Sequence, residues 1–290
     1  MFVSIKIKKI TLIIVSVALV IVITLGVTVP PVVKAEIKKM GSVEVPIIMY
    51  HSIVKDESMW NDYVLSPVDL EKDIIWLKKH GYRTVFVSDL INYVNGTGEL
   101  PEKPVILSFD DGCYNNFYYV YPLLKKYDVK ATMSVVGSYS EFACEEASPS
   151  PVYSYLDWED INKMRKSGLV EIANHSYDLH SLDDRQGVKM KSNETYDDYR
   201  HVFLTDTFRT QDLLEEFCGF TPIVYTYPYG FTCEAAERLV KNSGFQASLG
   251  VEEKLNYVEQ GNKDCLYNLC RFNRPAFIST EDFMEKYKIN

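Results

Sequence analysis

Short apolar runs alternate with helix-like segments along most of this 290-residue chain. Strands that are joined by helices pair in parallel, because each helix returns the chain to the same edge of the sheet. This many repeats favour a barrel over an open sheet, so we expect an α/β fold of the β/α-barrel type. The strand candidates are residues 47–50, 85–87, 104–109, 131–136, 169–173, 223–227 and 245–249. The helix candidates are residues 66–81, 88–94, 119–127, 157–168, 198–217 and 232–242, and residues 138–155 are expected to form a polar loop.

Two adjacent aspartates close one of these strand candidates. Asp110 and Asp111 follow the apolar run Val105–Leu107 and precede Gly112. In α/β folds, active sites collect at the carboxyl ends of the strands. A buried pair of neighbouring carboxylates needs a metal ion, a cation or strong hydrogen-bond donors. A solvated Asp-Asp-Gly turn is the alternative, and the pair alone does not decide between them.

Two of the chain's five histidines follow a second strand candidate. His175 and His180 come directly after the apolar residues 169–173. Five residues apart, they do not share a helix face, so we place them on a loop at the end of a strand. Two imidazoles and one carboxylate form a metal site with open positions for water and substrate. A polar loop without a metal is the alternative. It is less favoured because the aspartate pair and the histidine pair both directly follow predicted strands.

These motifs resemble those of the polysaccharide deacetylases of carbohydrate esterase family 4. Ser108–Gly112 is similar to the family's T-F-D-D-G motif, with Ser108 in place of threonine. His175–His180 resembles its histidine motif, and Tyr227–Gly230 resembles its R-x-P-Y-G motif. The resemblance covers residues 44–278 and implies a distorted (β/α)7-type barrel.

Three departures from the family pattern narrow the match. The family's two histidines are usually four apart, and here no histidine follows His201 to form the usual Leu-x-His motif. Instead, His51 ends the first strand candidate, which is similar to the branch that deacetylates poly-β-1,6-N-acetylglucosamine in biofilms, where the motifs are permuted. Thr226 stands in place of the arginine of R-x-P-Y-G. We expect Arg271 or Arg274 to orient the catalytic aspartate instead, unless both are surface residues.

The resemblance implies a ligand set and a general base. Asp111, His175 and His180 would hold one divalent ion, zinc first, with nickel, cobalt or iron as alternatives. Such an ion polarises the acetyl carbonyl and lowers the pKa of a water toward about 7. Asp110 would take the proton of that water. The residues alone leave open which of the two aspartates contacts the metal.

Further roles fall to residues outside the metal site. His51, as an imidazolium, would protonate the departing amine. Backbone N–H groups near Tyr229 would stabilise the oxyanion, and Tyr229 and Pro228 would contact the substrate.

The N-terminal segment, residues 1–35, is expected to direct the chain to the membrane. Three lysines precede an uncharged apolar run from Ile10 to Val29. A run of about 20 residues spans a bilayer and exceeds most signal-peptide cores. Basic residues ahead of the run hold that end in the cytoplasm, which places the rest outside. We favour an uncleaved anchor, with cleavage after Val33–Ala35 as the alternative, and we expect an anchored or secreted protein at the extracellular face.

The charge of the remaining residues, 36–290, excludes one class of partner. They carry 27 basic and 40 acidic side chains. This acidic balance argues against nucleic acid, which needs a basic face, and suits a neutral polymer that becomes cationic as acetyl groups leave. Simple solubility explains the charge equally well. The length fits one catalytic domain, which we expect to be monomeric.

The sequence therefore predicts a hydrolase that removes N-acetyl groups from an extracellular amino-sugar polymer, with poly-β-1,6-N-acetylglucosamine as the first candidate. Peptidoglycan, chitin-like oligomers and acetylated xylan are alternative substrates. A non-catalytic carbohydrate-binding protein on the same fold is the alternative of another class, and the missing arginine at position 226 is its only support.

Overall fold

The structure is a computed structural model that describes residues 41–289. The expected anchor or signal, residues 1–35, lies outside the described residues. Between residues 41 and 289, no helix has the length and apolar character to cross a membrane.

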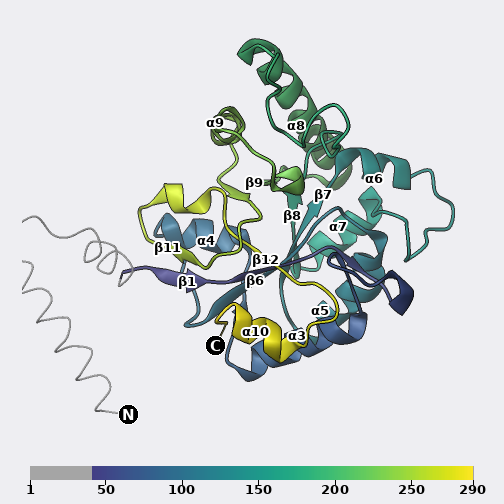
Figure 1. Cartoon of the computed structure of the whole chain (residues 1–290), viewed down its shortest axis with the longest axis vertical. Coiled ribbons are helices and arrows are strands. Elements are labelled where there is room, and N and C mark those ends of the chain that lie inside the picture. The colour runs from purple at the N-terminus through teal and green to yellow at the C-terminus, as the bar shows by residue number, and fades with distance from the viewer. Residues whose placement is uncertain (1–40, 290) are drawn as a thin grey trace, which may run out of the picture. The chain divides into compact units, whose positions relative to one another are not determined.

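A curled sheet of parallel strands forms the centre of the fold (Figure 1). Its main path runs β10-β9-β8-β7-β6-β2-β12, and β5 pairs with β6 off this path. The strands are β2 (Ile47–Tyr50), β5 (Arg83–Thr84), β6 (Pro104–Phe109), β7 (Ala131–Val135), β8 (Val170–Asn174), β9 (Val224–Thr226), β10 (Ala247–Leu249) and β12 (Phe272–Asn273). An isolated parallel bridge between Leu249 and Leu269 links β10 to the residues just ahead of β12. The sheet therefore forms a curled half-barrel in place of a fully closed barrel. The Leu249–Leu269 pair is the point at which its two edge regions come into contact.

Helices follow most strands and cover the sheet. They are α3 (Pro67–Lys79), α4 (Val87–Val94), α5 (Tyr121–Tyr127), α6 (Gly137–Ala143), α7 (Trp158–Lys166), α8 (Tyr196–Cys218), α9 (Glu234–Asn242) and α10 (Thr280–Lys286). Figure 1 shows α10, near the C-terminus, beside α3. Short strands also pair outside the main sheet: β1 (Val43–Val45) runs antiparallel to β11 (Asn256–Val258), and β3 (Ser52–Ile53) runs parallel to β4 (Val64–Leu65).

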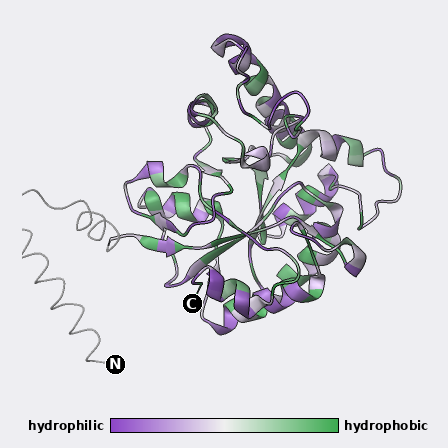
Figure 2. Ribbon diagram, viewed as in Figure 1, coloured by the Kyte–Doolittle hydropathy of each residue, from purple (hydrophilic) through white to green (hydrophobic). Residues whose placement is uncertain are grey.

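Both faces of the central strands are buried. Neighbouring residues of one strand belong to different core clusters: Ile47 and Ile106 pack in one, and Ile48 and Leu107 in the other. Strands covered on both faces read as continuous apolar runs rather than as an alternating pattern, which is why these runs were visible in the sequence. Figure 2 shows the corresponding contrast, with helices that are apolar on one side and hydrophilic on the other.

Two of the predicted helix starts, at Ser66 and Asp157, carry side-chain caps. The Ser66 side chain accepts the N–H of Asp69 at 2.9 Å, and Pro67 occupies the first turn of α3. Asp157 accepts the N–H of Asp160 in the same way at the start of α7. Such caps satisfy N–H groups that have no partner within the helix.

The predicted strand 85–87 is wrong, because α4 already begins at Val87 and the strand is β5 instead. The reason lies far away in the sequence. The Glu171 carboxylate on β8 accepts the N–H groups of Val87 and Ser88, each at 3.0 Å, and the Thr132 hydroxyl at 2.9 Å. A cap that comes from another strand leaves no local signal.

The predicted polar loop 138–155 is also wrong in part. Its first residues form α6, although the rest of the segment is irregular. The turn that follows Val136 places Tyr139 beside the site described below. The helix expected near 119–127 is preceded by a π-helical turn over Asn116–Val120, and α5 begins only at Tyr121.

The cap on α4 gives a prediction about stability. Replacing Glu171 by alanine leaves two helix N–H groups and a hydroxyl without their acceptor. We expect the free energy of unfolding to fall by about 1–3 kcal/mol, measured by urea denaturation. The exposed Glu216 on α8 provides a matched control, and Glu216→Ala should change stability by less than about 0.5 kcal/mol. Equal effects of the two substitutions would contradict the capping role.

Candidate active site

The site lies where β6 and β8 end. Asp110 and Asp111 follow β6, and His175 follows β8. Parallel strands end at the same edge of the sheet, which brings these segments together. Asp111 has a φ of 71° and Gly112 a φ of 67°. This pair of left-handed residues turns the chain sharply, and a Cβ at position 112 would lie only 3.3 Å from the Val135 side chain.

Three side chains converge as candidate metal ligands. The Asp111 carboxylate oxygen lies 3.2 Å from Nε2 of His180 and 3.6 Å from Nε2 of His175. One ligand atom from each of the three residues lies within 4.8 Å of the others. The spacing of five between the histidines is accommodated because they lie on the loop after β8, with the rings 5.0 Å apart.

The second nitrogen of each imidazole supports this fit. Nδ1 of His175 lies 2.8 Å from the Thr226 carbonyl oxygen. A carbonyl only accepts, so Nδ1 carries the proton, and in the neutral ring Nε2 presents its lone pair toward Asp111. Nδ1 of His180 lies 3.2 Å from the Tyr139 hydroxyl. Metal-bound histidines are generally oriented through the other nitrogen in this way.

Electrostatics in the triad favour a cation at its centre. Burial raises the pKa of Asp111, but protonated His175 and His180, which donate hydrogen bonds to it, and the charge on His51 together hold the pKa well below its ordinary value. Burial lowers the pKa of His175, but Asp111, Asp110 and the Thr226 carbonyl together raise it by more. A lone pair facing a carboxylate is repulsive, so His175 needs either a proton or a metal ion on Nε2. A donor set of one carboxylate and two imidazoles fits zinc and similar divalent ions.

The second aspartate is held by an arginine from the C-terminal part of the chain. Nη1 of Arg271 lies 2.8 Å from the Asp110 carboxylate and 2.7 Å from the Ser108 hydroxyl. Nε of Arg271 donates to the Gly250 carbonyl at 2.6 Å. Burial raises the pKa of Asp110, but Arg271, with smaller contributions from His175 and His51, lowers it below its ordinary value, so Asp110 remains a carboxylate.

The two arginines offered by the sequence therefore lie in different places. Arg271 contacts Asp110, whereas Arg274 pairs with Asp73 of α3. The alternative that both are surface residues is wrong, because both side chains are buried. Thr226, at the position of the family's arginine, bonds the Ser134 hydroxyl and presents its carbonyl to His175.

His51 follows β2 and lies in the same electrostatic environment. Burial lowers the pKa of His51, while Asp110 and Asp111 raise it and Arg271 lowers it further. Its ring lies edge-on to Tyr63 with the centroids 5.0 Å apart. Nδ1 of His51 is buried and has no hydrogen-bond partner within residues 41–289.

Aromatic side chains border the triad on the side of His180. Tyr229 has a φ of 56°, is 42% exposed and stacks on His180 with the ring centroids 4.4 Å apart. Pro228 before it is buried. The tilted rings of Tyr139 and Tyr155 have their centroids 4.3 Å apart, and burial raises the pKa of Tyr139 to about 12, which keeps its hydroxyl protonated. Sequence reasoning missed Tyr139, because the segment was expected to be a loop without a role.

Comparison with known proteins places the chain in a family. Residues 97–248, more than half of the chain, match the polysaccharide deacetylase family. The chain belongs to that family. A poly-β-1,6-N-acetyl-D-glucosamine N-deacetylase of Staphylococcus aureus (strain MSSA476) is 26% identical over 194 residues, which are 67% of this chain and 63% of the relative. The relative of the same name in Escherichia coli (strain K12) is 25% identical over 217 residues, 66% of this chain and 31% of the relative. The match thus spans less than two thirds of these relatives.

Solved structures have the same fold. A de-N-acetylase from Aggregatibacter actinomycetemcomitans is 27% identical, with a TM-score of 0.70 over 82% of this chain and 96% of the other. IcaB from Ammonifex degensii is 24% identical, with a TM-score of 0.66 over 80% of this chain and 92% of the other, a likeness of fold alone.

The triad predicts how metal binding depends on single residues. His175→Ala or His180→Ala removes one of three ligands, and we expect zinc affinity to fall by more than about a hundredfold, beyond the loss typical of an outer-shell change. Titration of the metal-stripped chain with zinc, followed by calorimetry, measures this. His201→Ala, an exposed position on α8, should bind zinc normally. Unchanged affinity in either site variant would disprove the assignment.

Proposed function

We propose that this protein is a metal-dependent hydrolase that removes N-acetyl groups from an extracellular amino-sugar polymer, with poly-β-1,6-N-acetylglucosamine as its substrate. The observation that carries the proposal is the pairing of Asp110 with the buried Arg271, directly beside the triad of Asp111, His175 and His180. This arrangement separates a base from a ligand set, which is what amide hydrolysis needs. The names of the relatives support the choice of polymer.

Asp110 is the proposed general base. When bound by the triad, a divalent ion supplies Lewis acidity and lowers the pKa of a water. Asp110 stays ionised because Arg271, together with His175 and His51, lowers its pKa against the effect of burial, and it is free to accept the proton of the attacking water. Arg271 also fixes the carboxylate in one orientation, since its guanidinium is itself held by Ser108 and Gly250.

His51 and Tyr229 complete the proposed reaction. His51 donates a proton to the departing amine, which would otherwise be a poor leaving group. The N–H groups of Gly230 and Phe231 are used within their own turn, by the carbonyls of Tyr227 and Pro228. The N–H of Tyr229 is therefore the proposed donor to the developing oxyanion. Its ring and Pro228 would contact the sugar.

The remaining attributes are also proposals. Zinc is the proposed ion, with nickel, cobalt or iron as alternatives. The extracellular location, the membrane attachment and the monomeric state rest on the sequence arguments, in particular on the apolar segment within residues 1–35.

Alternative substrates are peptidoglycan, chitin-like oligomers and acetylated xylan. Acetate release from each polymer, with and without a chelator, distinguishes them: the proposal requires the fastest, chelator-sensitive release from poly-β-1,6-N-acetylglucosamine. The non-catalytic alternative is weakened, because Arg271 contacts Asp110 although the motif arginine is missing. Zinc binding without acetate release from any of these polymers would favour it.

The two aspartates should respond differently to the same substitution. Asp110→Asn removes the base but no ligand, so we expect zinc affinity to stay within about threefold while turnover falls by about a hundredfold or more. Asp111→Asn should weaken zinc binding and turnover together. Calorimetry and acetate release measure the two properties. If Asp110→Asn loses the metal and Asp111→Asn retains it, the roles are reversed.

His51→Ala should reduce turnover by roughly a hundredfold, in the range of general acids, with zinc binding retained. Because protonated His51 is the reactive form, kcat/KM falls as pH rises through its pKa. Burial lowers the pKa of His51, so this alkaline limb should lie below the pH of about 6.5 that an exposed imidazole gives. The variant should lack the limb. Normal turnover in His51→Ala would refute the acid role.

A further inference from the structure

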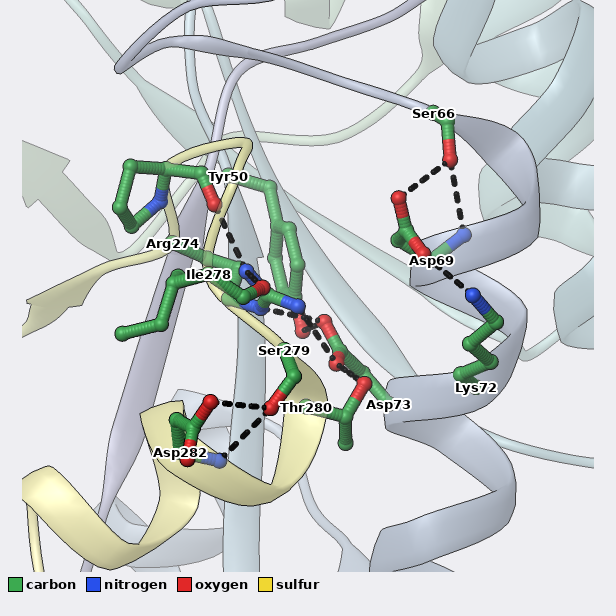
Figure 3. Close-up of polar contacts among 11 residues, drawn as sticks. Tyr50, Ser66, Asp69, Lys72, Asp73, Arg274, Ile278, Ser279, Thr280 and Asp282 are labelled. Carbon is green, nitrogen blue, oxygen red and sulfur yellow. Dashed lines mark hydrogen bonds and ion pairs between the residues drawn. The ribbon is translucent and has the colours of Figure 1, made fainter.

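A second buried ion pair lies beside β2, outside the site itself. Asp73 of α3 accepts two hydrogen bonds from Arg274, from Nε at 2.9 Å and from Nη2 at 3.2 Å. It also accepts the Thr280 hydroxyl at 2.6 Å and the Tyr50 hydroxyl at 3.2 Å. Figure 3 shows the Arg274 guanidinium at the centre of this cluster, which draws together α3, β2 and the start of α10.

Other hydrogen bonds of Arg274 reach further parts of the chain. Nη1 donates to the carbonyls of Pro275, at 2.6 Å, and Ile278, at 3.0 Å, which closes the turn between them. The backbone N–H of Arg274 donates to the Met49 carbonyl at 2.9 Å. Arg274 thus fastens the chain after β12 to α3, to β2 and to its own following turn.

A buried ion pair is weak evidence for stability, because removing two charges from water costs about as much as their attraction returns. Both side chains of this pair are fully buried, with 0% exposure. In some proteins the effect of such a pair is instead to specify one arrangement among several. Here the ion pair fixes where the segment between β12 and α10 lies along the neighbouring strand β2.

That position determines where Arg271 lies. β12 has only two residues, Phe272 and Asn273, paired with Ile48 and Met49 of β2. So short a strand fixes its own register weakly, and a slip of one residue would turn every side chain of the strand to the opposite face. Arg271 precedes β12 directly and Arg274 follows it directly. An anchor on Arg274 therefore controls whether Arg271 reaches Asp110.

We infer that Asp73 and Arg274 are positioning residues that hold Arg271 against Asp110, and so set the geometry of the proposed general base. The inference rests on the proposed function for its kinetic consequences. The Tyr50 hydrogen bond extends the same control to β2, where the next residue is His51. No residue of the cluster needs to contact substrate or metal.

The test begins with Asp73→Asn, which keeps the shape of the side chain and removes its charge. A displaced base acts on the transition state and not on substrate binding, so we expect kcat to fall roughly ten- to a hundredfold with KM and zinc affinity within about twofold of the parent. The matched control is Glu171→Gln. Glu171 is a buried carboxylate near the start of β8, at the end away from His175, and it caps α4. It should lose stability without this loss of kcat. Equal loss of kcat in both variants would overturn the inference.

A double-mutant cycle then separates positioning from a general structural effect. If Asp73 acts through Arg271, adding Asp73→Asn to Arg271→Lys should reduce kcat by less than about twofold beyond Arg271→Lys alone. Multiplication of the two single effects would overturn the inference. Should Asp73→Asn fail to fold, Thr280→Val removes one hydrogen bond from Asp73 and should show a smaller effect with the same dependence on Arg271.

A crystal structure of Asp73→Asn keeps this inference separate from the proposed function. If the parent chain releases no acetate from any polymer, the proposed function fails, but the crystal structure still tests the positioning. We expect Arg271 to leave hydrogen-bond distance of Asp110 in the variant. An unchanged contact between Arg271 and Asp110 would overturn the inference whatever the activity.

Discussion

The contact between Arg271 and Asp110 is the interaction on which the site depends. A carboxylate buried at the end of β6 is costly unless a cation accompanies it, and Arg271 is that cation. The same guanidinium holds Ser108 of β6 and the carbonyl of Gly250 after β10. One side chain therefore joins the middle of the sheet to its two edges, at the point where the sheet curls until Leu249 and Leu269 meet.

Adjacent carboxylates acquire different environments because the backbone turns sharply between them. Asp111 and Gly112 both have left-handed φ angles, a conformation that is rarely adopted by residues other than glycine, asparagine and aspartate. Asp110 is thereby directed to Arg271 and Asp111 to the two imidazoles. Strain of this kind is found where function requires it. A glycine suits position 112 on steric grounds as well, since a Cβ there would lie 3.3 Å from the Val135 side chain.

The missing arginine shows how a charge can be supplied from a different segment. In the family motif the arginine would stand at position 226, on β9, whereas here a buried Thr226 accepts a hydrogen bond from the candidate ligand His175 through its carbonyl. The positive charge comes instead from the residue before β12, about 45 residues further along the chain. The curled sheet makes the exchange possible, because both ends of the strand order approach the same space above β6.

The sequence by itself determined the strands that are followed by the aspartates and by the histidines, the helix starts at Ser66 and Asp157, and the set of residues that meet at one sheet edge. These features are local or follow from parallel pairing, so apolar runs and their flanking residues reveal them. It did not determine which of Arg271 and Arg274 reaches Asp110, nor the start of α4, nor the hydrogen bond between Tyr139 and His180. Each of these is decided by contacts between residues tens to hundreds of positions apart: Arg274 is drawn to Asp73, and Val87 to Glu171. Only the tertiary structure brings those partners together, because a buried charge selects the one partner that packing places within hydrogen-bond distance.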